Sequence, residues 1–146
     1  MPKLSVWTVR SALVALVVGT LMGALMLAAK AGMAPPMLMR LLPVHQEIVL
    51  LGWLVQLAMG VGYWILPRVD GARPRAWLAV VAVICLNGGV VAAALGAWFG
   101  LAGAVVCGRI LELVAAIGFV GHFWTRIRLG GLINRLSAEE IAARRS

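Results

Sequence analysis

Four apolar runs, each long enough to cross a bilayer as a helix, constrain the fold of this chain more than any other feature. They cover residues 6–29, 44–66, 76–99 and 101–124. A helix needs about 20 consecutive apolar residues to span the hydrocarbon core. Backbone groups in lipid must pair within the segment, so helices are the favoured structure for such runs. The sequence therefore predicts an all-α fold, a four-helix transmembrane bundle forming one membrane domain over residues 1–146.

The composition agrees with a membrane location. Hydrophobic residues make up 63% of the chain, charged residues only 12%, and the mean hydropathy is +1.01. These values exclude a water-soluble globule with an ordinary charged surface. The net charge of +8 does not indicate nucleic-acid binding, because the basic residues lie between and after the apolar runs without an aromatic-interleaved patch. We expect a multi-pass integral membrane protein of the bacterial inner (plasma) membrane, with the lipid bilayer as its surroundings.

The basic residues also predict the orientation in the membrane. One set of loops and ends carries Lys3, Arg10, Arg68, Arg73, Arg75, Arg126, Arg128, Arg135, Arg144 and Arg145. The opposite set carries only Lys30 and Arg40. By the positive-inside rule both termini and the tail 125–146 are cytoplasmic, and the second span runs inward with His45 near the outer surface. In the tail, Ser137 and Glu140 have capping-box spacing, which predicts a short cytoplasmic helix; a frayed polar tail is the alternative.

Small residues recur where helices must approach closely. The third and fourth spans are separated only by a tight turn near Gly100, which predicts a helical hairpin. Gly19 and Gly23 form a GxxxG pattern in the first span, typical of close helix packing. The third span has a similar face formed by Gly89, Ala93 and Gly96. The pattern predicts a tight bundle or a homo-oligomer.

Polar residues inside the spans are the candidates for function. An ionisable side chain at the centre of a membrane helix costs about 2.5–3.5 kcal/mol, so its presence needs a reason. Gln56 and Asn87 are explained most simply by hydrogen bonds between helices. The full set is His45, Glu47, Gln56, Asn87, Arg109, Glu112 and His122.

One face of the second span combines a histidine with small residues. At spacings of three and four, this face contains His45, Val49, Gly52, Gln56, Gly60 and Tyr63. A flat macrocycle whose iron is ligated by His45 would need such a surface beneath the histidine. The alternative is an interfacial histidine above a glycine-rich packing face. Both interpretations remain open at this point.

The charged residues of the fourth span allow two interpretations as well. Arg109 and Glu112 are three residues apart and close enough to pair. They form either a self-neutralising ion pair or a site where Arg109 binds a haem propionate, for which Glu47 would compete. His122 is not a second ligand to the same iron as His45, because the two differ in depth by roughly 25 Å at about 1.5 Å per residue. We expect His122 to be interfacial.

The stretch "HQEIVLLGWLVQLAMGVGYWILPR", residues 45–68, resembles the second transmembrane helix of subunit I in the haem–copper oxidase and nitric-oxide reductase superfamily. In that family a histidine at the outer end of this helix ligates a low-spin haem. The corresponding features here are His45, "LGW" at 51–53 and "GVGYWILPR" at 60–68. The resemblance covers mainly the second span, and the order of all four spans agrees with the first four helices of the family.

The resemblance implies half of a low-spin haem b site. The implied iron ligand is His45. With the helical face of the second span and the propionate interpretation of Arg109, the candidate cofactor-binding residues are His45, Gly52, Gln56, Gly60 and Arg109. Another subunit, a second copy of the chain, or one of the outer-loop methionines Met33, Met37 and Met39 would supply the second ligand. The chain departs from the family in lacking the later histidines of the catalytic metal centre. We therefore expect no catalytic residues and no oxygen or nitric-oxide reduction by this chain alone.

Three classes of function follow from these features. The first is a small haem-binding membrane protein that transfers electrons or belongs to a respiratory complex, as a homo-oligomer or with other membrane subunits. The second is a cofactor-free structural or assembly subunit, whose polar residues only fix helix packing. The third is a small four-helix transporter, although the first span lacks the carboxylate that such exporters characteristically have.

Overall fold

The computed structural model describes the backbone of residues 2–66 and 75–143, and the side chains as far as residue 124. Within these ranges the chain is helical with short connecting turns, and no strand occurs, which confirms the predicted all-α fold. The elements are α1 (Lys3–Lys30), the 3-10 helix η1 (Pro36–Leu41), α2 (Leu42–Glu47), the π-helix η2 (Ile48–Val55), α3 (Gln56–Ile65), α4 (Ala76–Phe99) and α5 (Ala102–Ala143). The loop predicted around residues 68–75 lies mostly outside the described residues.

Four segments are long and apolar enough to cross a membrane: Lys3–Lys30, Pro36–Ile65, Ala76–Phe99 and Ala102–Trp124. They correspond to the four predicted runs, and the chain is an integral membrane protein. The second segment starts eight residues before the predicted 44, because η1 and α2 extend the helix toward the preceding loop. Most large apolar side chains point outward, as expected where lipid surrounds the protein.

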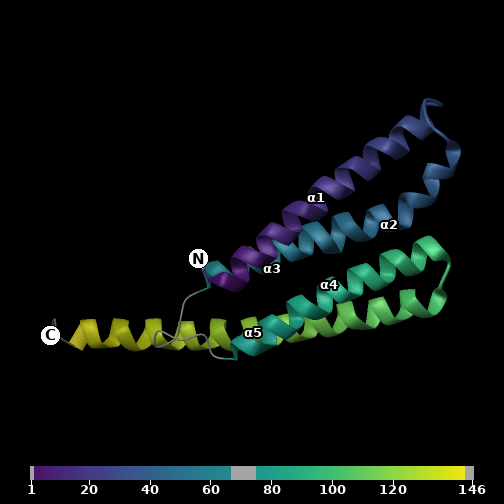
Figure 1. The fold of residues 1–146 in the computed structure, drawn as a ribbon. Helices are drawn as coiled ribbons and strands as arrows, with labels where there is room; N and C mark the ends of the chain where they lie inside the picture. The colour runs from purple at the N-terminus through teal and green to yellow at the C-terminus, as the bar shows by residue number, and fades with distance from the viewer. Residues whose placement is uncertain (1, 67–74, 144–146) are drawn as a thin grey trace.

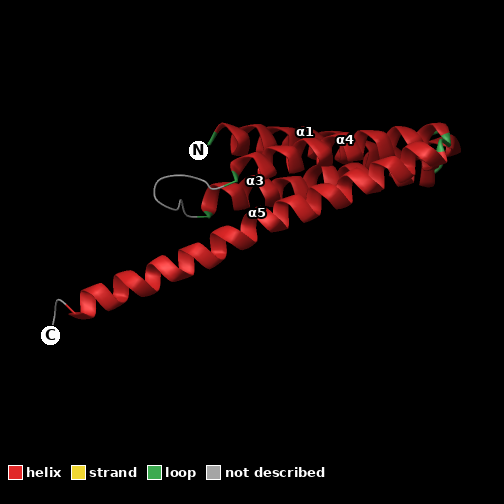
Figure 2. Cartoon of the chain, turned by 90° about the horizontal axis from the view of Figure 1, so that it is seen from below, coloured by secondary structure: helices red, strands yellow, loops and turns green. Residues whose placement is uncertain are grey.

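The four spans form two helical hairpins, one from α1 and the α2–η2–α3 segment and one from α4 and α5 (Figure 1). The two hairpins contact each other and overlap in the view from below, where α5 extends beyond the bundle (Figure 2). Gly100 ends α4 with φ +71°, a left-handed conformation that glycine adopts without steric cost, and so provides the predicted turn. In the second hairpin, a Cβ on Gly108 would lie 2.7 Å from both Ala93 N and Gly89 O. The small residues of the third span therefore serve packing within the chain.

The second membrane segment is not a uniform α-helix. Its middle, Ile48–Val55, is a π-helix flanked by α-helical turns. A π segment bonds residue i to i+5, which widens the turn and shifts the register of the side chains that follow. Such segments occur often at functional sites, and this one begins three residues after His45.

The tail differs from the sequence prediction. Helix α5 continues without a break from the fourth span to Ala143, so Ser137 lies within a helix and does not start one. The prediction of a new short helix was wrong because propagating an existing helix costs far less than nucleating a second one. The capping-box residues are therefore only further positions along α5.

Candidate functional site

His45 lies in α2 and contacts the first span. Its Nδ1 is 2.9 Å from the carbonyl oxygen of Gly19, to which it donates a hydrogen bond because a carbonyl can only accept. The ring also packs on Gly23, where a Cβ would lie 3.1 Å from His45 Cε1. The GxxxG pattern of α1 thus makes room for the imidazole. With Nδ1 protonated, the lone pair of Nε2 is the one left to bind a metal, and a backbone carbonyl is a common orienting partner for a metal-ligating histidine.

The glycine face below His45 is covered by α1. A Cβ on Gly52 would lie 3.4 Å from Ala15 Cβ, and one on Gly60 would lie 3.0 Å from Val9 Cγ2. Gln56, on the same side, donates a hydrogen bond to the Ser11 hydroxyl. These three residues therefore form a helix–helix contact in this chain. A macrocycle does not fit against Gly52 and Gly60 in this arrangement, whereas His45 itself fits the role of an axial ligand.

Sequence reasoning missed the hydroxyl residues of the first span. Ser5 donates to the carbonyl of Gly60, and Ser11 accepts from Gln56, so both join α1 to the second span. Thr8, between them, is buried and donates to Leu4 O in its own helix. Spacings of three place these hydroxyls on one helix face, and that periodicity was the signal that could have identified them. Asn87, expected to bond between helices, instead donates to Val83 O of α4 at 2.8 Å.

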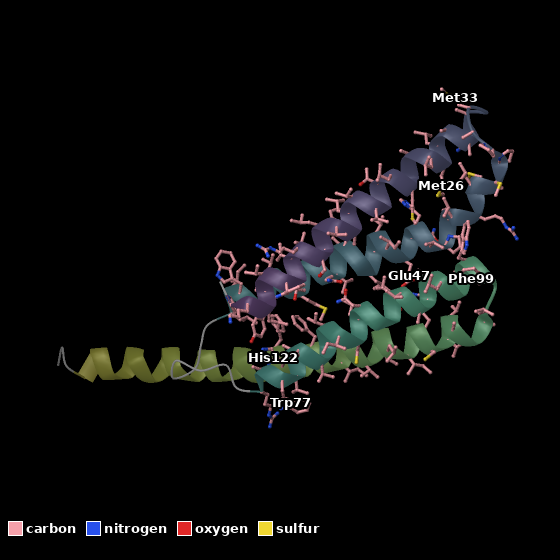
Figure 3. All side chains as sticks on the ribbon, viewed as in Figure 1. Met26, Met33, Glu47, Trp77, Phe99 and His122 are labelled. Atoms are coloured by element: carbon pink, nitrogen blue, oxygen red, sulfur yellow. The ribbon has the colours of Figure 1, made fainter. Side chains whose placement is uncertain are left out.

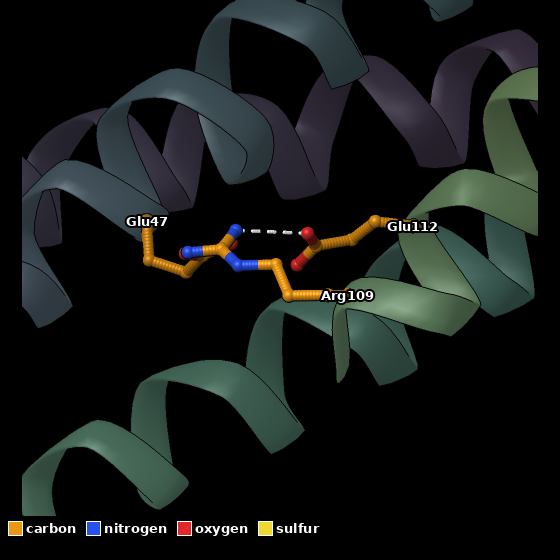
Figure 4. A network of polar contacts seen from close by, with 3 residues as sticks. All are labelled: Glu47, Arg109 and Glu112. Carbon is orange, nitrogen blue, oxygen red and sulfur yellow. Dashed lines mark hydrogen bonds and ion pairs between the residues drawn. The ribbon is translucent and has the colours of Figure 1, made fainter. Parts of the chain in front are cut away.

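A charged triad joins the two hairpins. Arg109 Nη2 lies 2.6 Å from Glu47 Oε2, and Arg109 Nη1 lies 2.9 Å from Glu112 Oε2 (Figure 4). A second contact, from Nη1 to Glu47 Oε1 at 3.0 Å, makes the pairing with Glu47 bidentate. The structure therefore forms the ion pair predicted within the fourth span and adds Glu47 from the first hairpin.

Because Arg109 already pairs with two carboxylates, it has little capacity left to bind a haem propionate. Glu47 and Glu112 are 4% and 8% exposed, and Glu112 Oε1 is buried without a hydrogen bond to any described residue. When all three groups are ionised, the two carboxylates outweigh the single guanidinium. A third carboxylate would therefore meet no uncompensated positive charge, and Arg109 acts in this arrangement as a clamp between hairpins.

His122 lies near the opposite end of the bundle from Glu47 (Figure 3). Its side chain is 0% exposed and stacks on Tyr63, with ring centroids 5.5 Å apart. His122 is two residues from the end of the fourth span at Trp124, so its position near the membrane interface stays a prediction; its burial against Tyr63 of α3 shows that the ring faces the interior of the bundle. The neighbouring Trp124 is exposed and remains a candidate interfacial anchor.

The three methionines between the first and second spans are exposed. Met33 lies at the tip of the first hairpin, and Met37 and Met39 belong to η1. Among the residues whose side chains the structure describes, no group of three or more His, Cys, Asp or Glu side chains is arranged to hold a metal ion.

Comparisons of the chain with known protein families, with curated proteins and with solved structures found no match. The helices and their apolar surfaces define a four-span helical membrane protein.

Proposed function

We propose that this protein is a small haem-binding subunit of the bacterial inner membrane, with both termini cytoplasmic and His45 as an axial ligand to a b-type haem. The observation that carries the proposal is the hydrogen bond from His45 Nδ1 to Gly19 O, which selects the tautomer with a free Nε2. The resemblance of residues 45–68 to the haem helix of the oxidase superfamily supports the same residue. When bound, the haem would supply one-electron chemistry.

The contribution of this chain is then to hold and orient the imidazole. Gly19 fixes the ring rotation through its carbonyl, and Gly23 leaves the space that the ring occupies. Because α1 covers Gly52 and Gly60, the haem would lie elsewhere around His45, and a partner would complete its site. A second copy of the chain is the simplest partner, since a two-fold axis along the membrane normal brings two His45 side chains to one depth.

Absorption spectra of the detergent-purified protein, produced in haem-supplemented cells, test the proposal. We expect a Soret band that shifts on reduction with dithionite, and its loss in His45→Ala. The matched control is His122→Phe, which removes a histidine but keeps an aromatic ring against Tyr63 and should leave the spectrum unchanged. An unchanged spectrum in His45→Ala would show that the ligand is another residue.

A variant that displaces the His45 ring provides a second test of the proposed ligand. Gly23→Ala places a Cβ 3.1 Å from His45 Cε1, so the ring must shift by a few tenths of an ångström, and we expect an altered midpoint potential or weaker haem retention. Gly103→Ala is the control, since nothing lies within 4 Å of that position. If Gly23→Ala and Gly103→Ala behave alike, His45 is not held against α1 when haem is bound.

A second candidate is a cofactor-free structural or assembly subunit. The observation that favours it is that Gly52, Gln56, Gly60 and Arg109 all make helix–helix contacts within the chain. Wild-type protein without any Soret band, from cells supplied with ample haem, would favour this function over haem binding.

A further inference from the structure

A continuous groove runs along one side of the bundle between α1 and α4. It consists of two hollows, of about 450 Å³ and about 390 Å³. Ile48, Val90 and Val91 line both hollows, so the two are parts of one groove with η2 as its floor. Figure 2 shows α1 and α4 running along the same side of the molecule. The groove does not include His45 and is separate from the proposed haem ligand.

The two ends of the groove differ in chemistry. The part nearer the N-terminus has Trp7 and Arg10 at its rim and the polar side chains of Gln56 and Asn87 inside. The other part has a wholly apolar lining that ends at Trp98. A ligand that matches the groove has a polar head at the Arg10 end and an apolar chain along the rest.

The length of the groove suits a single fatty-acyl chain. Trp7 lines one end and Met22 the other, and fifteen residues of helix between them span roughly 22 Å at about 1.5 Å per residue. The groove is therefore longer than one leaflet of the hydrocarbon core, which is ~15 Å thick, half of the ~30 Å total. An acyl chain that starts at the Arg10 rim therefore remains inside the groove over its whole length.

The rim favours an anionic head. Arg10 is exposed, and none of the ion pairs formed by the described residues involves it. A guanidinium binds a phosphate through two parallel hydrogen bonds, and the adjacent exposed Trp7 is of the type that lies at headgroup level. We propose that the groove binds one anionic phospholipid, with its phosphate on Arg10 and one acyl chain between α1 and α4.

Native mass spectrometry of the whole protein tests this proposal. The protein is delipidated in detergent and then mixed with either phosphatidylglycerol or phosphatidylcholine. We expect one bound phosphatidylglycerol per chain at concentrations where phosphatidylcholine is not retained, and about a tenfold loss of phosphatidylglycerol retention in Arg10→Gln. Equal retention of the two lipids, or wild-type retention in Arg10→Gln, overturns the charge assignment.

A second pair of variants tests the groove. Val91→Trp places an indole where the two hollows meet, at a position that is 57% exposed, so the bundle keeps its packing, and we expect loss of the bound lipid. Ile84→Trp is the matched control, also on α4 and 65% exposed but outside the groove lining, and should retain the lipid. Circular dichroism checks that both variants stay helical. Undiminished phosphatidylglycerol binding in Val91→Trp overturns the proposal.

Discussion

Replacing Arg109 by glutamine should destabilise the fold strongly. The change leaves Glu47 and Glu112, which are 4% and 8% exposed, without the cation that joins them. Removing one partner of a buried ion pair costs about 3–5 kcal/mol. Because Arg109 itself is 55% exposed, we expect the lower end, about 3 kcal/mol, which corresponds to roughly a hundredfold change in the unfolding equilibrium at about 1.4 kcal/mol per factor of ten.

Two further variants distinguish the stability lost with the contact between the hairpins from the stability lost when buried carboxylates are left unpaired. Glu47→Gln leaves Arg109 paired with Glu112 and should cost about 1 kcal/mol, the usual range for one polar contact between membrane helices. The double variant Glu47→Gln/Arg109→Gln removes one buried charge as well as the cation. We therefore expect it to be more stable than Arg109→Gln alone.

Unfolding in mixed micelles with increasing sodium dodecyl sulfate, followed by tryptophan fluorescence and circular dichroism, measures these differences. Arg40→Gln is the matched control, because Arg40 is exposed on η1 and such surface changes stay within about 0.5 kcal/mol. If Arg109→Gln is as stable as Arg40→Gln, the triad does not join the hairpins. If the double variant is less stable than the Arg109 single variant, the reasoning about unpaired carboxylates fails.

Three further predictions concern packing and topology. Gly108→Leu should separate α4 from α5 and destabilise the hairpin in the same assay, whereas Gly103→Leu, with nothing within 4 Å of its Cβ position, should not. His122→Ala should cost about 2 kcal/mol or more because the ring is fully buried, and should leave any haem spectrum unchanged. In a cysteine-free background, a membrane-impermeant thiol reagent added outside should label Met33→Cys and should not label Arg75→Cys; the reverse pattern would invert the orientation.

The general fold could be predicted from local features of the sequence. Run length and hydropathy predicted the four spans, and Gly100 predicted the turn between α4 and α5, because each depends on residues close together in the chain. The pair Arg109–Glu112 was predictable for the same reason, since residues three apart on a helix are neighbours. The π-helix was not predictable, because nothing in a uniformly apolar run distinguishes bonding to i+5 from bonding to i+4.

The candidate site depended on tertiary structure. Hydrophobic periodicity places His45 on a face of the second span, but only the pairing of α1 with α2 brings it to Gly19 O, 26 residues earlier. Glu47 meets Arg109 across 62 residues for a similar reason, because the order in which the two hairpins pack decides that contact. In lipid, every outward apolar side chain finds an equally apolar partner, so composition does not specify which helix faces which. That choice depends on close approach at glycines and on interhelical hydrogen bonds, which only the folded chain contains.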